Sequence, residues 1–247
     1  MDKLNQKFTL VIPTYNEAAN IENLCSLLTE VLSKNNIDFE VIVVDDDSPD
    51  QTWKIVQVIA ENDKRIKLMP RVNEKGVARA VIAGWLNAQG DILGVIDGDL
   101  QQPPEAVPLL LNKLNADTQI DIVVASRNLK GALALRRSFW RRFVSWLGTL
   151  ISLRLLPQLL AQVSDPMSGF FILRKEVIKN KVLTPWGYKI LLEVLAKGSY
   201  KKVAEVPYLF AERKRGGSKA GLRQYFISFI YLLKLSFQSK KNSKKIK

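Results

Sequence analysis

The sequence contains no histidine and a single cysteine, Cys25. Without histidine there can be no histidine-based triad, general base or metal ligand, and one cysteine can form neither an internal disulfide nor a cysteine-rich metal site. Acid–base chemistry and metal binding must therefore rely on carboxylates, amides, lysine, arginine or tyrosine. Cys25 lies in a helical apolar pattern, so we interpret it as a small core residue.

Long apolar runs are also missing. The two best candidates, residues 143–153 and 225–233, reach about half of the roughly 20 residues that a helix needs to cross a bilayer. The N-terminal stretch lacks the charged-then-apolar order of a signal peptide. We therefore expect a cytoplasmic protein without a full membrane span.

Negative charge is scarce in the second half of the chain. Residues 1–126 carry 11 Lys+Arg against 19 Asp+Glu, whereas residues 127–247 carry 26 against 5. The acidic half suits a bound cation, and the basic half suits phosphate groups, nucleic acid or an anionic membrane. No nucleic-acid-binding motif accompanies the positive charge, which lies with tryptophans and leucines on short apolar segments. We therefore do not expect nucleic acid as a partner.

Apolar runs alternate with segments of helical periodicity over the acidic half. The expected strands are 8–12, 39–44, 66–69, 92–96 and 120–125, and the expected helices are 17–32, 53–62, 78–88 and 104–114. This alternation predicts an α/β fold with a mostly parallel sheet flanked by helices. In such sheets ligands bind beyond the carboxyl ends of the strands, so the residues after each strand are the candidates for function.

The basic half has a different pattern. No acidic residue occurs from 128 to 164, and arginines with tryptophans over residues 137–153 predict a basic amphipathic helix in the plane of a membrane interface. Residues 221–247 combine a second amphipathic helix with a basic tail suited to anionic lipid headgroups. A buried inter-domain helix and a core helix with a solvated tail are the alternatives. We expect one domain over residues 1–220, followed by this segment.

The strongest candidate for chemistry follows the fourth expected strand. Asp97 and Asp99 flank Gly98, and Gln101 comes two residues later. Carboxylates one residue apart at a strand end project to the same side, and the glycine lets a ligand approach the backbone. Carboxylate and amide oxygens suit Mg²⁺ or Mn²⁺, with phosphate oxygens completing the shell. A surface turn is the alternative interpretation.

Two other strand ends carry polar groups. After the first strand, Tyr15 offers a ring for stacking on a base and Glu17 offers acceptors for base N–H groups. In the acidic run after the second strand, Asp46 is the candidate for recognising a base or ribose, and Asp50 for stabilising the next helix. A turn with a helix cap is the alternative at both places. The glycine-rich dinucleotide and P-loop motifs are absent.

Six blocks of sequence carry a family resemblance. They are VIPTYNEAANI, VVDDDSPDQT, GDILGVIDGDLQQPPE, ASRN, SDPMSGFFILRKEV and FAERKRGGSK. In this order and spacing they resemble the family 2 glycosyltransferases of the dolichyl- and polyprenyl-phosphate mannose or glucose synthase type. The resemblance covers residues 8–231 and implies a GT-A fold, an inverting mechanism, a nucleotide-sugar donor, and Mg²⁺ or Mn²⁺. The Gln-x-x-Arg-Trp motif of processive polysaccharide synthases is absent.

The resemblance also implies roles for particular residues. Those matching nucleotide contacts are Pro13, Tyr15, Glu17, Val44, Asp46 and Gly98. Those matching the metal and diphosphate motif are Asp97, Asp99 and Gln101. Arg127 matches an arginine near the transferred sugar, and with Asp97 and Asp99 it forms the expected catalytic set. Those matching donor and acceptor phosphate contacts are Arg141, Ser145, Lys189, Arg213 and Lys219. Arg142 is an alternative to Arg141 because the loop before it varies in length.

The expected reaction moves mannose from GDP-mannose onto dolichyl or polyprenyl phosphate at the cytoplasmic face of a membrane. A polyprenyl-phosphate glucosyltransferase that uses UDP-glucose is the alternative, as is a family 2 transferase with a non-lipid acceptor. A non-catalytic partner subunit is a further alternative, which the intact acidic motif disfavours. The sequence does not indicate a protein partner.

Overall fold

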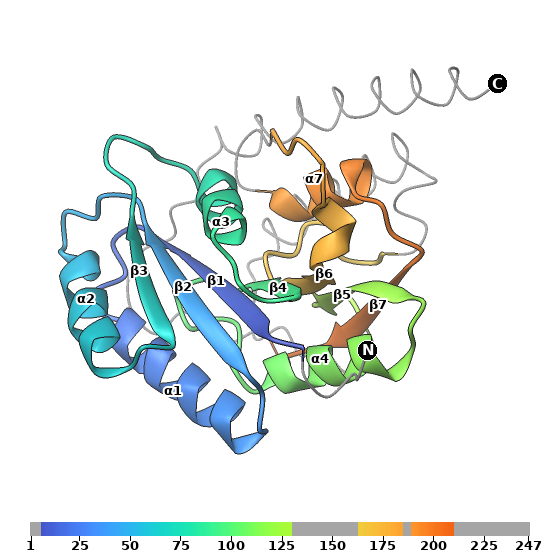
Figure 1. The fold of residues 1–247 in the computed structure, drawn as a ribbon, viewed down its shortest axis with the longest axis horizontal. Helices are drawn as coiled ribbons and strands as arrows, with labels where there is room; N and C mark the ends of the chain where they lie inside the picture. The colour runs from blue at the N-terminus through green and yellow to red at the C-terminus, as the bar shows by residue number, and fades with distance from the viewer. Residues whose placement is uncertain (1–5, 130–162, 185–188, 210–247) are drawn as a thin grey trace.

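The computed structural model describes residues 6–129, 163–184 and 189–209 (Figure 1). These residues form a seven-stranded sheet flanked by helices. The strands are β1 (Phe8–Thr14), β2 (Phe39–Asp45), β3 (Ile66–Pro70), β4 (Ile92–Val95), β5 (Ile120–Ser126), β6 (Phe171–Arg174) and β7 (Lys202–Pro207). The helices are α1 (Ile21–Lys34), α2 (Thr52–Asn62), α3 (Val77–Leu86), α4 (Ala106–Ala116) and α7 (Ile190–Lys197), with a 3-10 helix η2 (Lys175–Ile178) after β6.

The sheet is parallel except for one strand. Its order is β3-β2-β1-β4-β6-β5-β7, and β6 runs antiparallel to both β4 and β5. The remaining pairs, from β3 to β4 and from β5 to β7, are parallel. The carboxyl ends of β1, β2, β4 and β5 therefore meet at one edge of the sheet, where the sequence analysis placed the functional residues.

Two apolar layers cover the two faces of the sheet. On β1, Leu10 and Ile12 face the layer formed with α1, α2 and α4, whereas Val11 faces the layer formed with α3 and α7. The same alternation occurs on β2, because successive side chains of a strand point to opposite faces. Figure 1 shows α1, α2 and α4 on one side of the sheet and α3 and α7 on the other. Nearly continuous apolar runs suit strands buried on both faces.

The five strands and four helices predicted from the acidic half are confirmed. The main difference is the start of α1, which was expected at residue 17 and begins at Ile21. The Glu17 carbonyl accepts bonds from the Asn20 and Ile21 N–H groups, so a separate turn precedes the helix. The elements β6, η2, α7 and β7 were not predicted from the sequence. The amphipathic segments predicted at 137–153 and 221–247, and the proposed boundary at 220, lie outside the described residues.

Helix α3 approaches the sheet closely through Gly84. A Cβ at this position would lie 2.7 Å from both γ-methyl carbons of Val11 and 3.2 Å from Val44 Cγ2. Real Cβ atoms do not come this close to other carbons, so a larger residue would push α3 away from β1 and β2. The carboxyl ends of these two strands carry candidate nucleotide contacts.

We predict that Gly84→Ala lowers the free energy of unfolding by about 1–3 kcal/mol, because overpacking outweighs the higher helix propensity of alanine. The measurement is urea-induced unfolding followed by circular dichroism. Leu86→Ala is the matched control on the same helix, because Leu86 is 81% exposed. It should change the stability by no more than about 0.5 kcal/mol. Unchanged stability of Gly84→Ala would contradict this packing.

Candidate active site

The turn after β4 holds Asp97 from two sides. The Asp97 N–H donates to Gln102 Oε1 at 2.8 Å, and Gln102 Nε2 donates to Asp97 Oδ2 at 2.6 Å. The Gln101 N–H donates to Asp99 Oδ1 at 3.1 Å. Leu100 has a φ of 60°, a left-handed conformation that is unusual for leucine and lets the turn reverse tightly. Gln102 is buried and orients Asp97, a role that the spacing of the sequence did not reveal.

Two glycines bring neighbouring segments against this turn. A Cβ at Gly98 would lie 3.3 Å from carbons of both Glu17 and Thr14, which places the turn against the end of β1. A Cβ at Gly169 would lie 3.1 Å from Asp97 Oδ2. The turn therefore lies against the end of β1 at Gly98, and the Asp97 carboxylate lies beside the segment that leads into β6.

The pKa of the Asp97 carboxyl group is raised from 3.8 to about 7. Burial is the largest cause, and the negative charge of Asp99 is the second. The positive charges of Lys189 and Arg127 and the hydrogen bond from Gln102 lower the pKa and only partly offset these effects. Two carboxylates and two basic groups from separate parts of the sequence therefore interact in one place.

The donor atoms of this turn fit a divalent cation. Asp97 and Asp99 repel each other, which is one cause of the raised pKa, and a cation between them would relieve that repulsion. In the described parts of the chain, no three His, Cys, Asp or Glu residues form a metal-binding group. A hard cation here would therefore need the amide oxygen of Gln101 and oxygens from a ligand to complete its shell.

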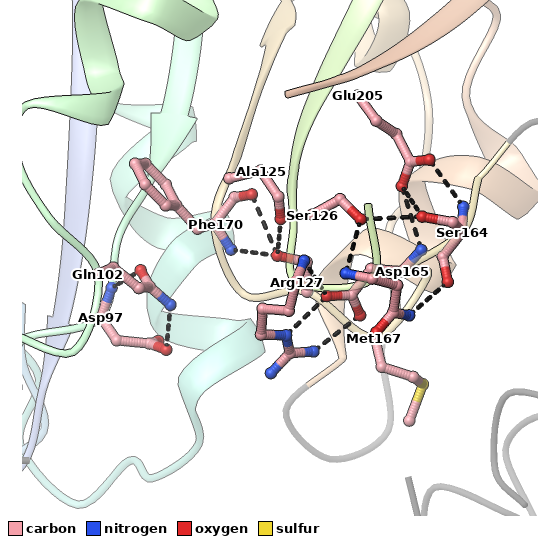
Figure 2. A network of polar contacts seen from close by, with 12 residues as sticks. Asp97, Gln102, Ala125, Ser126, Arg127, Ser164, Asp165, Met167, Phe170 and Glu205 are labelled. Carbon is pink, nitrogen blue, oxygen red and sulfur yellow. Dashed lines mark hydrogen bonds and ion pairs between the residues drawn. The ribbon is translucent and has the colours of Figure 1, made fainter. Parts of the chain in front are cut away.

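Arg127 is held by a carboxylate that the sequence analysis did not single out. Its Nε donates to Asp165 Oδ2 at 2.6 Å, its Nη2 donates to Asp165 Oδ1 at 2.8 Å, and its main-chain N–H also contacts Oδ2 (Figure 2). The side chains are 14% and 4% exposed, respectively. Burial alone would lower the pKa of Arg127 and raise that of Asp165, but the paired contact reverses both effects. Both groups are therefore charged at neutral pH.

Lys189 reaches the same region from the start of α7. Its Nζ donates to the Met167 carbonyl at 2.9 Å, and its charge lowers the pKa of both Asp97 and Asp165. The predicted phosphate contact Lys189 thus lies near the predicted catalytic residue Arg127, although they are far apart in the sequence.

Asp46, a predicted nucleotide contact, binds the loop after β3. Arg71 contacts Asp46 Oδ1 through Nε at 2.8 Å and through Nη2 at 2.7 Å, and the Gly76 N–H donates to Oδ2 at 2.7 Å. Arg71 and Asp46 are both buried. Gly76 has a φ of 134°, which a side chain would disfavour. Asp46 therefore shapes the loop between β3 and α3.

That loop also reaches Tyr15. Lys75 Nζ lies 4.9 Å from the centre of the Tyr15 ring, a cation–π distance, and 3.4 Å from the Tyr15 hydroxyl. The ends of β1, β2 and the loop after β3 therefore come together around Tyr15 and Asp46. This arrangement suits the predicted binding of a nucleotide base.

The other predicted nucleotide contacts lie along the same edge. Pro13 and Val44 are buried partners in the pairing of β1 with β2. Glu17 is buried and accepts a bond from Asn20 Nδ2 at 2.9 Å. Asp50 Oδ1 accepts hydrogen bonds from the hydroxyl and the N–H of Thr52. Asp50 therefore stabilises the start of α2, as predicted from the sequence.

Four predicted phosphate contacts, Arg141, Ser145, Arg213 and Lys219, lie outside the described residues, as does the alternative Arg142. Within the parts that are described, no helix has both the length and the apolar character needed to cross a membrane.

Residues 9–180 match the sequence profile of the family described as Glycosyl transferase family 2. The chain belongs to this family. It is 42% identical over 213 residues to the dolichol-phosphate mannosyltransferase of Pyrococcus furiosus, and the match covers 86% of this chain and 59% of that protein. This family 2 chain thus spans about three fifths of the length of its archaeal relative. The dolichol-phosphate mannosyltransferase of Saccharomyces cerevisiae is 32% identical over 223 residues, covering 86% of this chain and 80% of the yeast protein.

Solved structures give the same fold. A crystal structure of glucosyl-3-phosphoglycerate synthase from Mycobacterium tuberculosis, in complex with Mn²⁺, UDP-glucose and phosphoglyceric acid, has a TM-score of 0.73 and 20% sequence identity. The match covers 96% of this chain and 80% of that one. The predicted GT-A fold and the predicted membership of family 2 are therefore confirmed.

The raised pKa of Asp97 predicts an unusual dependence of stability on pH. Between pH 4 and pH 7 the folded protein keeps a proton that the unfolded chain releases, so this contribution is present at low pH and lost as the pH rises through about 7. In chelator, Asp97→Asn should be more stable than the wild type at pH 8 and about equal at pH 4. Asp97 keeps some solvent contact, so we expect a gain of about 1–2 kcal/mol.

The measurement is urea unfolding at both pH values. Asp117→Asn is the matched control. The Asp117 side chain is 38% exposed and its pKa is lowered, so no gain at pH 8 is expected. If Asp97→Asn changed the free energy of unfolding equally at pH 4 and pH 8, the pKa of Asp97 would not be raised in the folded protein.

Proposed function

We propose that this chain is an inverting glycosyltransferase that moves mannose from GDP-mannose onto dolichyl or polyprenyl phosphate. The proposal depends on one observation. At one edge of the sheet, the charges of Asp99, Arg127 and Lys189 all act on the Asp97 carboxyl group. Carboxylates beside basic groups suit a reaction between two phosphate-bearing substrates and a cation. The relatives named dolichol-phosphate mannosyltransferase support both the sugar and the acceptor.

A divalent cation fits the acidic turn. Mg²⁺ or Mn²⁺ held by Asp97, Asp99 and Gln101 would neutralise charge on the departing diphosphate. Arg127 and Lys189 would supply fixed positive charge beside the phosphates without reorganising during the reaction. The Mn²⁺ bound to a protein of the same fold supports the choice of metal.

The nucleophile in this reaction is an oxygen of the lipid phosphate. It is anionic at neutral pH and needs no strong general base, which is consistent with a chain that has no histidine. As its bond to the anomeric carbon forms, the bond from that carbon to the diphosphate oxygen breaks, and the electron pair leaves with GDP. Attack opposite the leaving group converts an α-linked donor into a β-linked product.

Binding of the two substrates falls to different parts of the chain. Tyr15 would stack on the base and Pro13, Glu17, Val44, Asp46 and Gly98 would line the nucleotide site. The phosphate contacts proposed outside the described residues are Arg141, Ser145, Arg213 and Lys219. The segments at 137–153 and 221–247 would hold the protein at the cytoplasmic face of a membrane, where the lipid phosphate is accessible.

The test is turnover by the full chain in detergent with GDP-mannose, UDP-glucose or UDP-N-acetylglucosamine, with and without polyprenyl phosphate and with and without chelator. We expect GDP release and a mannosylated lipid only with GDP-mannose, lipid phosphate and metal together. Turnover of UDP-glucose would replace the proposed donor, and turnover without lipid would replace the proposed acceptor. No turnover by folded protein would refute the proposal.

The acidic turn has a prediction of its own. Asp99→Ala should lower kcat by at least about 10²–10³-fold, because a preorganised charge at the diphosphate is lost. Asp117→Ala is the matched control, since Asp117 lies in the loop before β5 and contacts Lys202 at the surface. It should keep kcat within about twofold. Wild-type turnover by Asp99→Ala would remove Asp99 from the metal site.

A further inference from the structure

A group of polar side chains joins three segments behind Arg127. We call it the junction, and its members are Ser126, Asn128, Ser164, Asp165 and Glu205. Ser126 and Asn128 belong to the end of β5, Ser164 and Asp165 to the segment that leads into β6, and Glu205 to the edge strand β7. Figure 2 labels Ser126, Ser164, Asp165 and Glu205 of the junction, together with Asp97 and Gln102.

Glu205 is the main acceptor of the junction. Its Oε2 accepts from the Ser164 N–H at 2.9 Å, and its Oε1 accepts from the Ser164 hydroxyl at 3.0 Å and the Asp165 N–H at 3.1 Å. An ionised carboxylate only accepts hydrogen bonds, so it matches three donors. Two consecutive N–H groups aimed at one carboxylate fix the backbone of residues 164 and 165. These two hydrogen bonds therefore also fix the direction in which the Asp165 side chain points.

The direction of Asp165 decides the position of Arg127. Both carboxylate oxygens of Asp165 contact the Arg127 guanidinium, in the two-point geometry that constrains its plane. Arg127 in turn acts electrostatically on Asp97. Among the described residues, the side-chain hydrogen bonds of Glu205 go to Ser164 and Asp165, so these two residues connect Glu205 to the site.

We propose that Glu205 is a positioning residue that aims Arg127 at the reacting phosphates through Ser164, Asp165 and the backbone between them. The proposal rests on the proposed function for its kinetic consequence, but the geometric consequence is independent of it. No motif pointed to this role, since Glu205 is distant in sequence from every other member of the junction. The role follows from the parallel pairing of β7 with β5, in which Glu205 lies opposite Val124.

The first test is Glu205→Gln in the full chain. The amide must turn an NH₂ group toward one of the three donors, so the segment at 164–165 should shift while the shape of the side chain is kept. We expect kcat to fall by on the order of 10–100-fold, as is typical when a supporting partner of a site residue is lost. KM for the nucleotide sugar should change little, because Tyr15 and Asp46 lie elsewhere along the sheet edge.

A double-mutant cycle separates positioning from general destabilisation. If Glu205 acts through Arg127, then adding Glu205→Gln to Arg127→Ala should lower kcat by less than about twofold further. Glu40→Gln is the matched control. Like the half-buried Glu205, the buried Glu40 carboxylate accepts three hydrogen bonds, but from Thr9, Lys67 and Gln89. This substitution should lower thermal stability with kcat unchanged below the melting temperature. An equal loss of kcat from Glu205→Gln in both backgrounds, or no loss in either, would overturn the proposal.

A second measurement does not require turnover. The Nε–H signal of Arg127 can be assigned in ¹H–¹⁵N spectra by its absence in Arg127→Lys. We expect slow exchange with solvent in the wild type and in Glu40→Gln, and faster exchange in Glu205→Gln. An unchanged exchange rate in Glu205→Gln would refute the link to Arg127. A changed rate in a protein that turns over no nucleotide sugar would instead leave the link intact and refute the proposed reaction.

Discussion

The side chains of Arg127 and Asp165 are largely buried and form an ion pair. A buried charge without its partner costs several kcal/mol, so separating these two residues would destabilise the fold. Their contact joins the end of β5 to the segment before β6, and β6 is the only antiparallel strand of the described sheet. Gly169 in that segment then comes to lie against Asp97. The ion pair thus brings a second set of side chains to the acidic turn of β4.

Backbone strain is concentrated at the same edge of the sheet. Among the described non-glycine residues, seven have a positive φ, and five of these follow β1 to β4 at their carboxyl ends. These five are Asn16, Asp47, Gln51, Asn73 and Leu100. Left-handed conformations cost free energy and persist where surrounding contacts impose them. Asparagine and aspartate adopt this conformation more readily than most residues, so Gln51 and Leu100 are the two positions where surrounding contacts must impose it.

The sequence was sufficient for β1 to β5 and the helices between them, because buried strands and amphipathic helices alternate there with clear periodicity. It also placed Asp97 and Asp99 correctly at a strand end. The strands β6 and β7 were not anticipated, since their places in the sheet depend on pairing between distant segments, and neither was the helix α7 between them. For the same reason the partners Gln102, Asp165 and Glu205 were missed. Which side chain turns toward Asp97 or Arg127 is decided by tertiary packing, which spacing along the chain does not encode.

The junction has a consequence for how this chain can vary. Asn128 Nδ2 donates to the Ser164 carbonyl at 2.6 Å, and the Ser126 and Ser164 hydroxyls are 2.9 Å apart. Among the described residues, these contacts hold the end of β5 and the segment before β6 together at the junction. The free energy of closing a loop grows only slowly with its length, by about 0.6 kcal/mol for each doubling. A change in the number of residues between positions 128 and 164 would therefore alter the stability of the sheet only slightly, because the junction holds both ends of that stretch.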